Sequence, residues 1–133
     1  MNADAVVYLD SSTLVKLVVR EPESNALAGH LRERPSRVSC ALARMEVVRA
    51  VGGHGQPSLN RARHLLARIS LLRLDDALLD EAAALTGGNL RSVDAIHLAA
   101  ARALGDALTE LITYDRRMAD AAQIMGLTVI APA

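Results

Sequence analysis

The sequence predicts an α/β fold of three layers, α/β/α, built around a central, mostly parallel sheet. The first indication is that short runs rich in β-branched residues alternate with longer segments rich in Ala, Leu and Arg. This order implies right-handed crossovers and a sheet covered by helices. The second indication is composition, because apolar residues make up 51% of the chain without any Phe or Trp, which predicts an aliphatic core. At 133 residues, the chain is expected to form a single domain, 1–133.

In the N-terminal half, the first expected strand is an apolar run that ends on Asp10. Hydroxyl residues follow it and open a helical pattern, which Pro22 divides into two helices. A later break, GGHGQP at 52–57, has the turn chemistry of a loop. The expected order is strand 5–9, helices 12–19 and 23–34, strand 37–39, helix 41–51 and, after the loop, helix 58–70.

In the C-terminal half, the β-branched runs are short and the Ala-rich segments between them are long enough for helices. TGGN at 86–89 resembles a helix stop, with Gly just past the helix end. The run LITYD reads as a strand that ends near Asp115. The expected order is a weak strand 71–74, helices 76–85 and 93–104, strand 111–113, helix 116–125 and strand 128–130.

Charge and composition exclude several function classes. Acidic and basic residues both number 15, which excludes a protein that binds nucleic acid by bulk positive charge. Aromatic residues make up 2%, which argues against a single-strand binder that stacks bases. Cys40 is the single cysteine, so neither an internal disulfide nor a zinc cluster is expected. No apolar run approaches the roughly 18 residues needed to span a bilayer, and Asp4 and Asp10 do not suit a signal peptide. We therefore expect a cytoplasmic protein without a membrane segment.

Four acidic residues from four separate segments are expected at one edge of the sheet. Asp10 and Asp115 follow two strands, and the carboxyl ends of parallel strands meet at one edge, where ligands bind in such folds. Asp94 lies in the first turn of a helix that we expect Ser92 to cap. Glu46 lies on a helix face with apolar neighbours, given about 3.6 residues per turn.

Each of these acids also has a purely structural explanation. Asp10 and Asp115 could cap helices, and Asp94 could interact with the helix dipole. Glu46 could pair with Arg49, three residues further along its helix. The four together are harder to explain in this way, because clustered carboxylates repel one another and are costly to desolvate without a cation. A hard divalent ion such as Mg²⁺ is the natural compensator, and it can activate water against a phosphodiester.

The segments YLDSSTLVKL, ALARMEVVRA, RSVDAIHLAAA and LITYDRRMADAA together resemble the PIN domain, specifically the VapC toxins of bacterial type II toxin–antitoxin pairs. The resemblance extends over 6–130, and all four acidic positions are present in order. It implies a PIN-domain fold and an endoribonuclease that depends on Mg²⁺ or Mn²⁺. It also implies structured RNA substrates (tRNA or ribosomal RNA), a homodimer, and a cognate VapB-type antitoxin that often sends a basic side chain into the acidic pocket.

The resemblance also implies roles for individual residues. Asp10 and Asp94 would be the principal metal ligands, directly or through water. Glu46 and Asp115 would complete the catalytic set by holding waters and orienting the attacking one. Ser12 and Thr113 match small polar positions beside the acids, where hydrogen bonds to the metal ligands are expected. For Ser12, a helix cap is an equal alternative.

Other residues and other families fit the sequence less well. Arg91, Arg116 and Arg117 flank the acids and could contact RNA phosphates, although a solvated surface is a slightly better explanation for each of them. His97 is three residues after Asp94 and could lie near the site, but a partly buried, hydrogen-bonded histidine is the better explanation. A receiver domain would need a lysine late in the chain, a haloacid-dehalogenase-type phosphatase a second aspartate in place of Ser12, and a P-loop enzyme a glycine-rich motif. The remaining alternative is a catalytically silent PIN-fold module that binds RNA or a partner protein without cutting.

Overall fold

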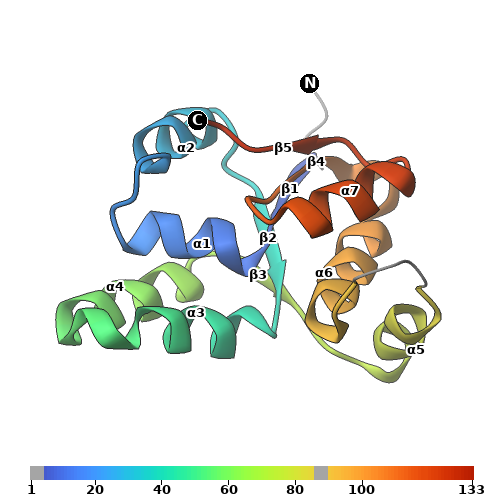
Figure 1. Ribbon diagram of the computed structural model, residues 1–133, viewed down its shortest axis with the longest axis horizontal. Coiled ribbons are helices and arrows are strands. Elements are labelled where there is room, and N and C mark those ends of the chain that lie inside the picture. The colour runs from blue at the N-terminus through green and yellow to red at the C-terminus, as the bar shows by residue number, and fades with distance from the viewer. Residues whose placement is uncertain (1–4, 86–89) are drawn as a thin grey trace.

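The computed structural model describes residues 5–85 and 90–133. In this part of the chain, one sheet of five parallel strands forms the centre, in the order β3-β2-β1-β4-β5 (Figure 1). The all-parallel pairing confirms the predicted fold class. The strands are β1 (Val6–Leu9), β2 (Arg37–Cys40), β3 (Ser70–Leu72), β4 (Leu108–Ile112) and β5 (Val129–Ile130).

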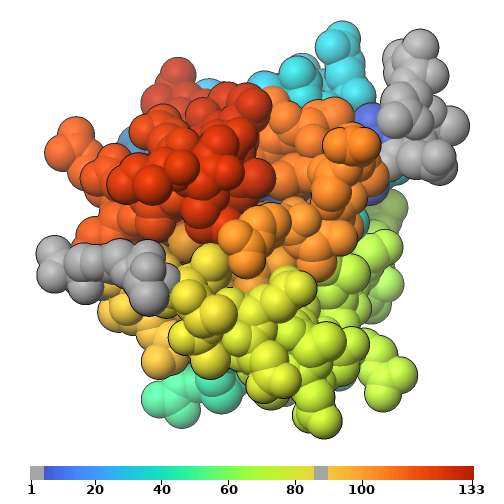
Figure 2. Space-filling view, turned by 90° about the vertical axis from the view of Figure 1, so that its right-hand side faces the viewer, coloured from blue at the N-terminus to red at the C-terminus, as the bar shows by residue number. Residues whose placement is uncertain are grey.

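Helices cover both faces of this sheet, as Figure 1 shows. The buried side chains of α1 to α4 belong to one apolar cluster, and those of α5 to α7 belong to a second cluster on the other face. Figure 2 views the second face, which α5 and α7 largely cover. The helices are α1 (Ser11–Val18), α2 (Ser24–Leu31), α3 (Ala43–Val51), α4 (Gln56–Ala67), α5 (Asp76–Ala84), α6 (Ser92–Ala103) and α7 (Arg116–Ile124).

The order of the elements is as predicted, and the differences lie at their ends. The helix expected at 58–70 begins earlier, at Gln56, because Pro57 fits the first turn, where backbone N–H groups have no partner in the helix. It also ends earlier, and Ser70 belongs to β3. The expected loop at 52–57 contains a 3₁₀ turn followed by Gly55, whose φ of 93° suits glycine. The expected helix stop at 86–89 lies outside the described residues.

Strand β1 is the centre of the sheet and is covered on both sides. Val7 and Leu9 point into one apolar cluster and Tyr8 into the other, as the alternation of side chains along a strand requires. Its last residue, Leu9, pairs with Ile112 of β4 in parallel register. The residues that follow these two strands therefore leave the sheet at the same edge.

The helices in the described part of the chain are too short or too polar to cross a bilayer. Their stability depends on the two apolar clusters, because amphipathic helices of this length are marginal by themselves.

A substitution pair tests the aliphatic core. Leu98 of α6 is fully buried, whereas Ile124 at the end of α7 is 87% exposed. Leu98→Ala should lower the free energy of unfolding by about 2–5 kcal/mol, because it leaves a cavity in the core. Ile124→Ala removes similar apolar volume from the surface and should change it by less than about 0.5 kcal/mol. Urea unfolding of both variants measures the difference, and equal losses would contradict this core.

Candidate active site

Asp10 is held more firmly than the other predicted site residues. Its side chain is almost completely buried and caps α1. Oδ1 accepts hydrogen bonds from the Ser12 hydroxyl (2.8 Å) and from both the backbone N–H (3.0 Å) and hydroxyl (2.9 Å) of Thr13. Oδ2 accepts one bond, from the Thr113 hydroxyl, at 2.6 Å. Because Oδ2 accepts fewer bonds than Oδ1, it is the oxygen of Asp10 with more capacity for a further partner.

Asp94 lies at the start of α6 and is also buried. Both of its oxygens contact Arg91, whose Nε lies 3.1 Å from Oδ2 and whose Nη2 lies 3.2 Å from Oδ1. The expectation that Ser92 caps this helix is wrong. Arg91 occupies the cap position, and its backbone N–H bonds to Asp94 Oδ2 at 3.3 Å, so the carboxylate satisfies one of the free N–H groups at this helix end.

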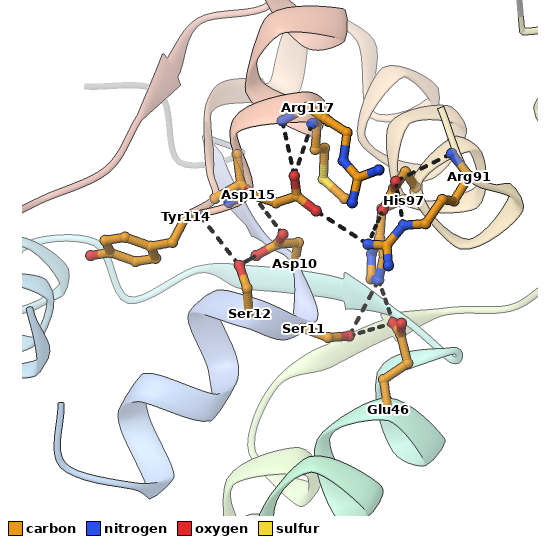
Figure 3. Close-up of polar contacts among 12 residues, drawn as sticks. Asp10, Ser11, Ser12, Glu46, Arg91, His97, Tyr114, Asp115 and Arg117 are labelled. Carbon is orange, nitrogen blue, oxygen red and sulfur yellow. Dashed lines mark hydrogen bonds and ion pairs between the residues drawn. The ribbon is translucent and has the colours of Figure 1, made fainter. Parts of the chain in front are cut away.

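Asp115 caps α7 with one oxygen and faces the site with the other. Oδ1 accepts the backbone N–H groups of Arg117 (2.9 Å) and Met118 (3.4 Å). Oδ2 lies 3.2 Å from Nη2 of Arg91. Arg91 therefore links Asp94 and Asp115 from two different helices (Figure 3).

Glu46 reaches the site from α3, on the opposite face of the sheet from α6. Its side chain is 25% exposed. Oε1 accepts hydrogen bonds from the Ser11 hydroxyl at 2.7 Å and from Nε2 of His97 at 2.8 Å. Its ion pair is with His97 rather than with Arg49, the partner that the sequence suggested.

His97 is hydrogen-bonded, as predicted, but with 2% exposure it is more fully buried than expected, and it also lies at the pocket. Its contact with Glu46 was missed, and so was Ser11. Burial lowers the pKa of His97, but hydrogen bonds to Cys40 and Glu46 outweigh burial and raise it to about 10. Burial raises the pKa of the Glu46 carboxyl, but hydrogen bonds from His97 and Ser11 outweigh burial and lower it overall.

The four acids line one open pocket of about 220 Å³. A larger hollow, about 790 Å³, lies between α1 and α4. Its lining includes three arginines and no acid, so size alone does not locate a metal site here. The small pocket combines the acids with two hydroxyls, a guanidinium and an imidazole. Its polar lining residues are Asp10, Ser11, Ser12, Glu46, Arg91, Asp94, His97 and Asp115.

The chemistry of these donors suits a hard cation. Within residues 5–85 and 90–133, no group of three acidic, histidine or cysteine side chains is arranged to hold a metal ion by itself. Mg²⁺ commonly takes only one or two carboxylates and keeps several waters. Asp10 and Asp94, the two most buried acids of the pocket, fit that requirement, and the Arg91 guanidinium beside Asp94 marks where positive charge is accepted.

The three arginines predicted near the acids differ in their positions. Arg91 lies in the pocket, although its side chain is 54% exposed. Arg116 and Arg117 are exposed in the first turn of α7, next to Asp115. These two side chains are therefore available at the surface beside the site, and contact with RNA stays a prediction for them.

Comparison with known proteins gives one consistent result. The PIN domain family matches residues 7–124. The chain is 54% identical over 128 residues to Ribonuclease VapC46 of Mycobacterium tuberculosis, and the match covers 96% of this chain and 98% of that protein.

Two solved structures share the fold. The crystal structure of Mycobacterium tuberculosis VapC20, described as a Sarcin-Ricin loop cleaving toxin, aligns with a TM-score of 0.77 at 14% identity and covers 95% of this chain and 99% of its own. A toxin–antitoxin complex from Klebsiella pneumoniae aligns with a TM-score of 0.74 at 24% identity and covers 96% of this chain and 98% of its own. At these identities the likeness shows the fold alone.

The pair of His97 and Glu46 should make stability depend on pH. The pKa of His97 is raised to about 10, so its contribution is complete below the unfolded value of 6.5 and is lost as pH rises through about 10. The pKa of Glu46 is lowered, so its contribution is present above 4.5 and is lost as pH falls through the lowered value. Urea unfolding should therefore show a difference between wild type and His97→Leu that shrinks from neutral pH towards pH 10. A constant difference would contradict the charged pair.

Proposed function

We propose that this chain, which belongs to the PIN domain family and to its VapC ribonucleases, cleaves structured RNA with the help of Mg²⁺ or Mn²⁺. VapC ribonucleases in general depend on a divalent cation, and the choice between these two ions is part of the proposal. Its VapC relatives and structural neighbours support the chain as the ribonuclease toxin of a type II toxin–antitoxin pair.

The observation that carries the proposal is the convergence of four acids from four segments on one pocket. Asp10 follows β1, Glu46 lies on α3, Asp94 on α6, and Asp115 follows β4. Two of them, Asp10 and Asp94, are 2% and 1% exposed. Burying carboxylates in this way is costly unless positive charge compensates them, which supports a cation site.

In the proposed reaction, Asp10 and Asp94 hold the cation, and the hydroxyls of Ser12 and Thr113 keep Asp10 in place. When bound, the cation would supply positive charge for the phosphoryl oxygen and lower the pKa of a water. Glu46 and Asp115 accept hydrogen bonds from water and orient it towards the phosphorus. The water oxygen bonds to phosphorus and gives up one proton, the bond from phosphorus to one ribose oxygen breaks, and that leaving oxygen takes up one proton, so that one water is added across the phosphodiester.

The RNA class is proposed as tRNA or ribosomal RNA. The description of VapC20 as a Sarcin-Ricin loop cleaving toxin supports a structured RNA without choosing between the two. Arg116 and Arg117 are exposed beside Asp115 and are proposed to contact phosphates, which position an RNA without reading its sequence.

The proposed protein partner is a VapB-type antitoxin. The similar Klebsiella pneumoniae structure is a toxin–antitoxin complex, and the pocket already accepts the guanidinium of Arg91 between two acids. A basic side chain of an antitoxin would satisfy the same carboxylates. A homodimer also stays a proposal, and light scattering of the purified protein tests it.

Induced expression in a bacterial host tests the ribonuclease. Wild type should arrest growth and produce discrete new RNA 5′ ends, whereas Asp94→Asn should not, because Asn keeps the size but loses the charge that holds the cation. Asp80→Asn, an exposed acid on α5, is the matched control and should behave as wild type. If wild type produces no new ends in a host that carries its natural RNA, a PIN-fold module that binds without cutting becomes the better explanation.

Metal binding can be measured without RNA. Titration calorimetry with MnCl₂ should show binding to wild type, and Asp10→Asn and Asp94→Asn should each weaken it by at least about tenfold, since even residues that only support metal ligands cost 10–100-fold. Asp80→Asn should leave the affinity unchanged. Equal affinities in all four proteins would show that the cation is not held by these two carboxylates.

A further inference from the structure

We infer that His97 is a positioning residue for the ribonuclease reaction, and that it acts by fixing the carboxylate of Glu46 at the edge of the acidic pocket. This inference rests on the proposed function, since it assigns a task to Glu46 in RNA cleavage. It adds to the four acids a buried group from the core of the protein.

His97 connects two layers of the fold that the sheet otherwise separates. It lies on α6, whose buried side chains pack on one face of the sheet, whereas Glu46 lies on α3, which packs on the other face. Nε2 of His97 lies 2.8 Å from Oε1 of Glu46. Because Asp94 is three residues before His97, about one helical turn, α6 carries one acid of the pocket and also holds another.

The imidazole has one orientation because its nitrogen Nδ1 contacts two residues of the core, Tyr8 and Cys40. Nδ1 lies 2.7 Å from the hydroxyl of Tyr8, a fully buried residue of the central strand β1. The two rings meet edge to face, with centroids 5.8 Å apart and an interplanar angle of 76°, an arrangement that aromatic pairs favour. Cys40 at the end of β2 lies 3.7 Å from the same nitrogen. With Nδ1 directed into the core, Nε2 points to Glu46 (Figure 3).

Glu46 needs such support more than Asp10 does. A long, free Glu side chain samples several rotamers and loses that freedom when it is fixed, and Arg49 lies three residues away on the same helix, close enough to attract it. The two bonds from His97 and Ser11 both end on Oε1. They fix the carboxylate and leave Oε2 directed to no other partner among the described residues. Because its pKa is raised to about 10, the His97 ring is positively charged at neutral pH, and this charge favours the ionised form of Glu46.

Steady-state cleavage assays that measure kcat and KM test this role. Their substrate is a synthetic RNA that spans the new 5′ end found by expression. His97→Leu removes the hydrogen bond and should lower kcat about 10–100-fold with little change in KM, because the buried ring does not face RNA. His97→Gln keeps an N–H donor at nearly the reach of Nε2 and should restore much of the rate. His64→Leu, the same change at an exposed site on α4, should keep the wild-type rate.

A double-mutant cycle with Glu46→Gln decides whether His97 acts through Glu46. If it does, His97→Leu combined with Glu46→Gln should be no slower than Glu46→Gln alone, since the two changes disrupt one unit. Additive losses, or a His97→Leu protein that is folded by circular dichroism and cleaves at the wild-type rate, would overturn the inference while leaving the ribonuclease intact. If wild type cleaves no RNA, the proposed function itself fails, which is a distinct result.

Discussion

The parallel pairing of β1 with β4 is the constraint on which the site depends. Leu9 and Ile112 are paired in register, so that Asp10 and Thr113, the next residues of each strand, are neighbours. The Thr113 hydroxyl then reaches Oδ2 of Asp10 at 2.6 Å, and the Thr13 hydroxyl, which has one proton to donate, lies 2.9 Å from Oδ1 of Asp10 and 2.7 Å from the Ile112 carbonyl oxygen. A slip of one residue would turn the side chains of β1 to the opposite face and would remove both contacts. The buried core of β1 and the geometry of the acidic pocket therefore depend on the same register.

Helix capping and participation in the site are compatible in this fold, because a carboxylate has two oxygens. Oδ1 of Asp10 accepts the N–H of Thr13 at the start of α1, while Oδ2 faces Thr113. Asp115 divides its oxygens in the same way, with Oδ1 on the backbone of α7 and Oδ2 towards Arg91. From sequence, a cap and a site residue were alternatives for each aspartate. In the structure, the cap is what fixes the direction of the second oxygen.

The sequence predicted the layers, the order of the elements and the four acids, because strand periodicity and chain order are local features. It could not predict which side chains meet across layers. The contact of His97 with Glu46 joins residues 51 positions apart, and the only available signals were the three-residue spacing from Asp94 and a hydroxyl, Ser11, next to Asp10. Residue type alone favours Ser92 as the cap, whereas in the structure Arg91 is at the cap position and Asp94 accepts its backbone N–H. Propensity rules rank residues singly and do not weigh such competition.

The acids of the pocket are balanced by two basic groups that differ in exposure. His97 is 2% exposed and hydrogen-bonded to Tyr8, so its ring keeps one position in the core. Arg91 is 54% exposed and enters the pocket from the start of α6, but its partner Asp94 is 2% exposed, so moving the guanidinium away is costly for Asp94 unless another cation takes its place. The proposed cation site would combine one buried countercharge, His97, that keeps its geometry with one partly exposed countercharge, Arg91, that a metal ion could replace. This division of tasks would allow the buried carboxylates to be stable in the folded chain and still be available to the proposed ion.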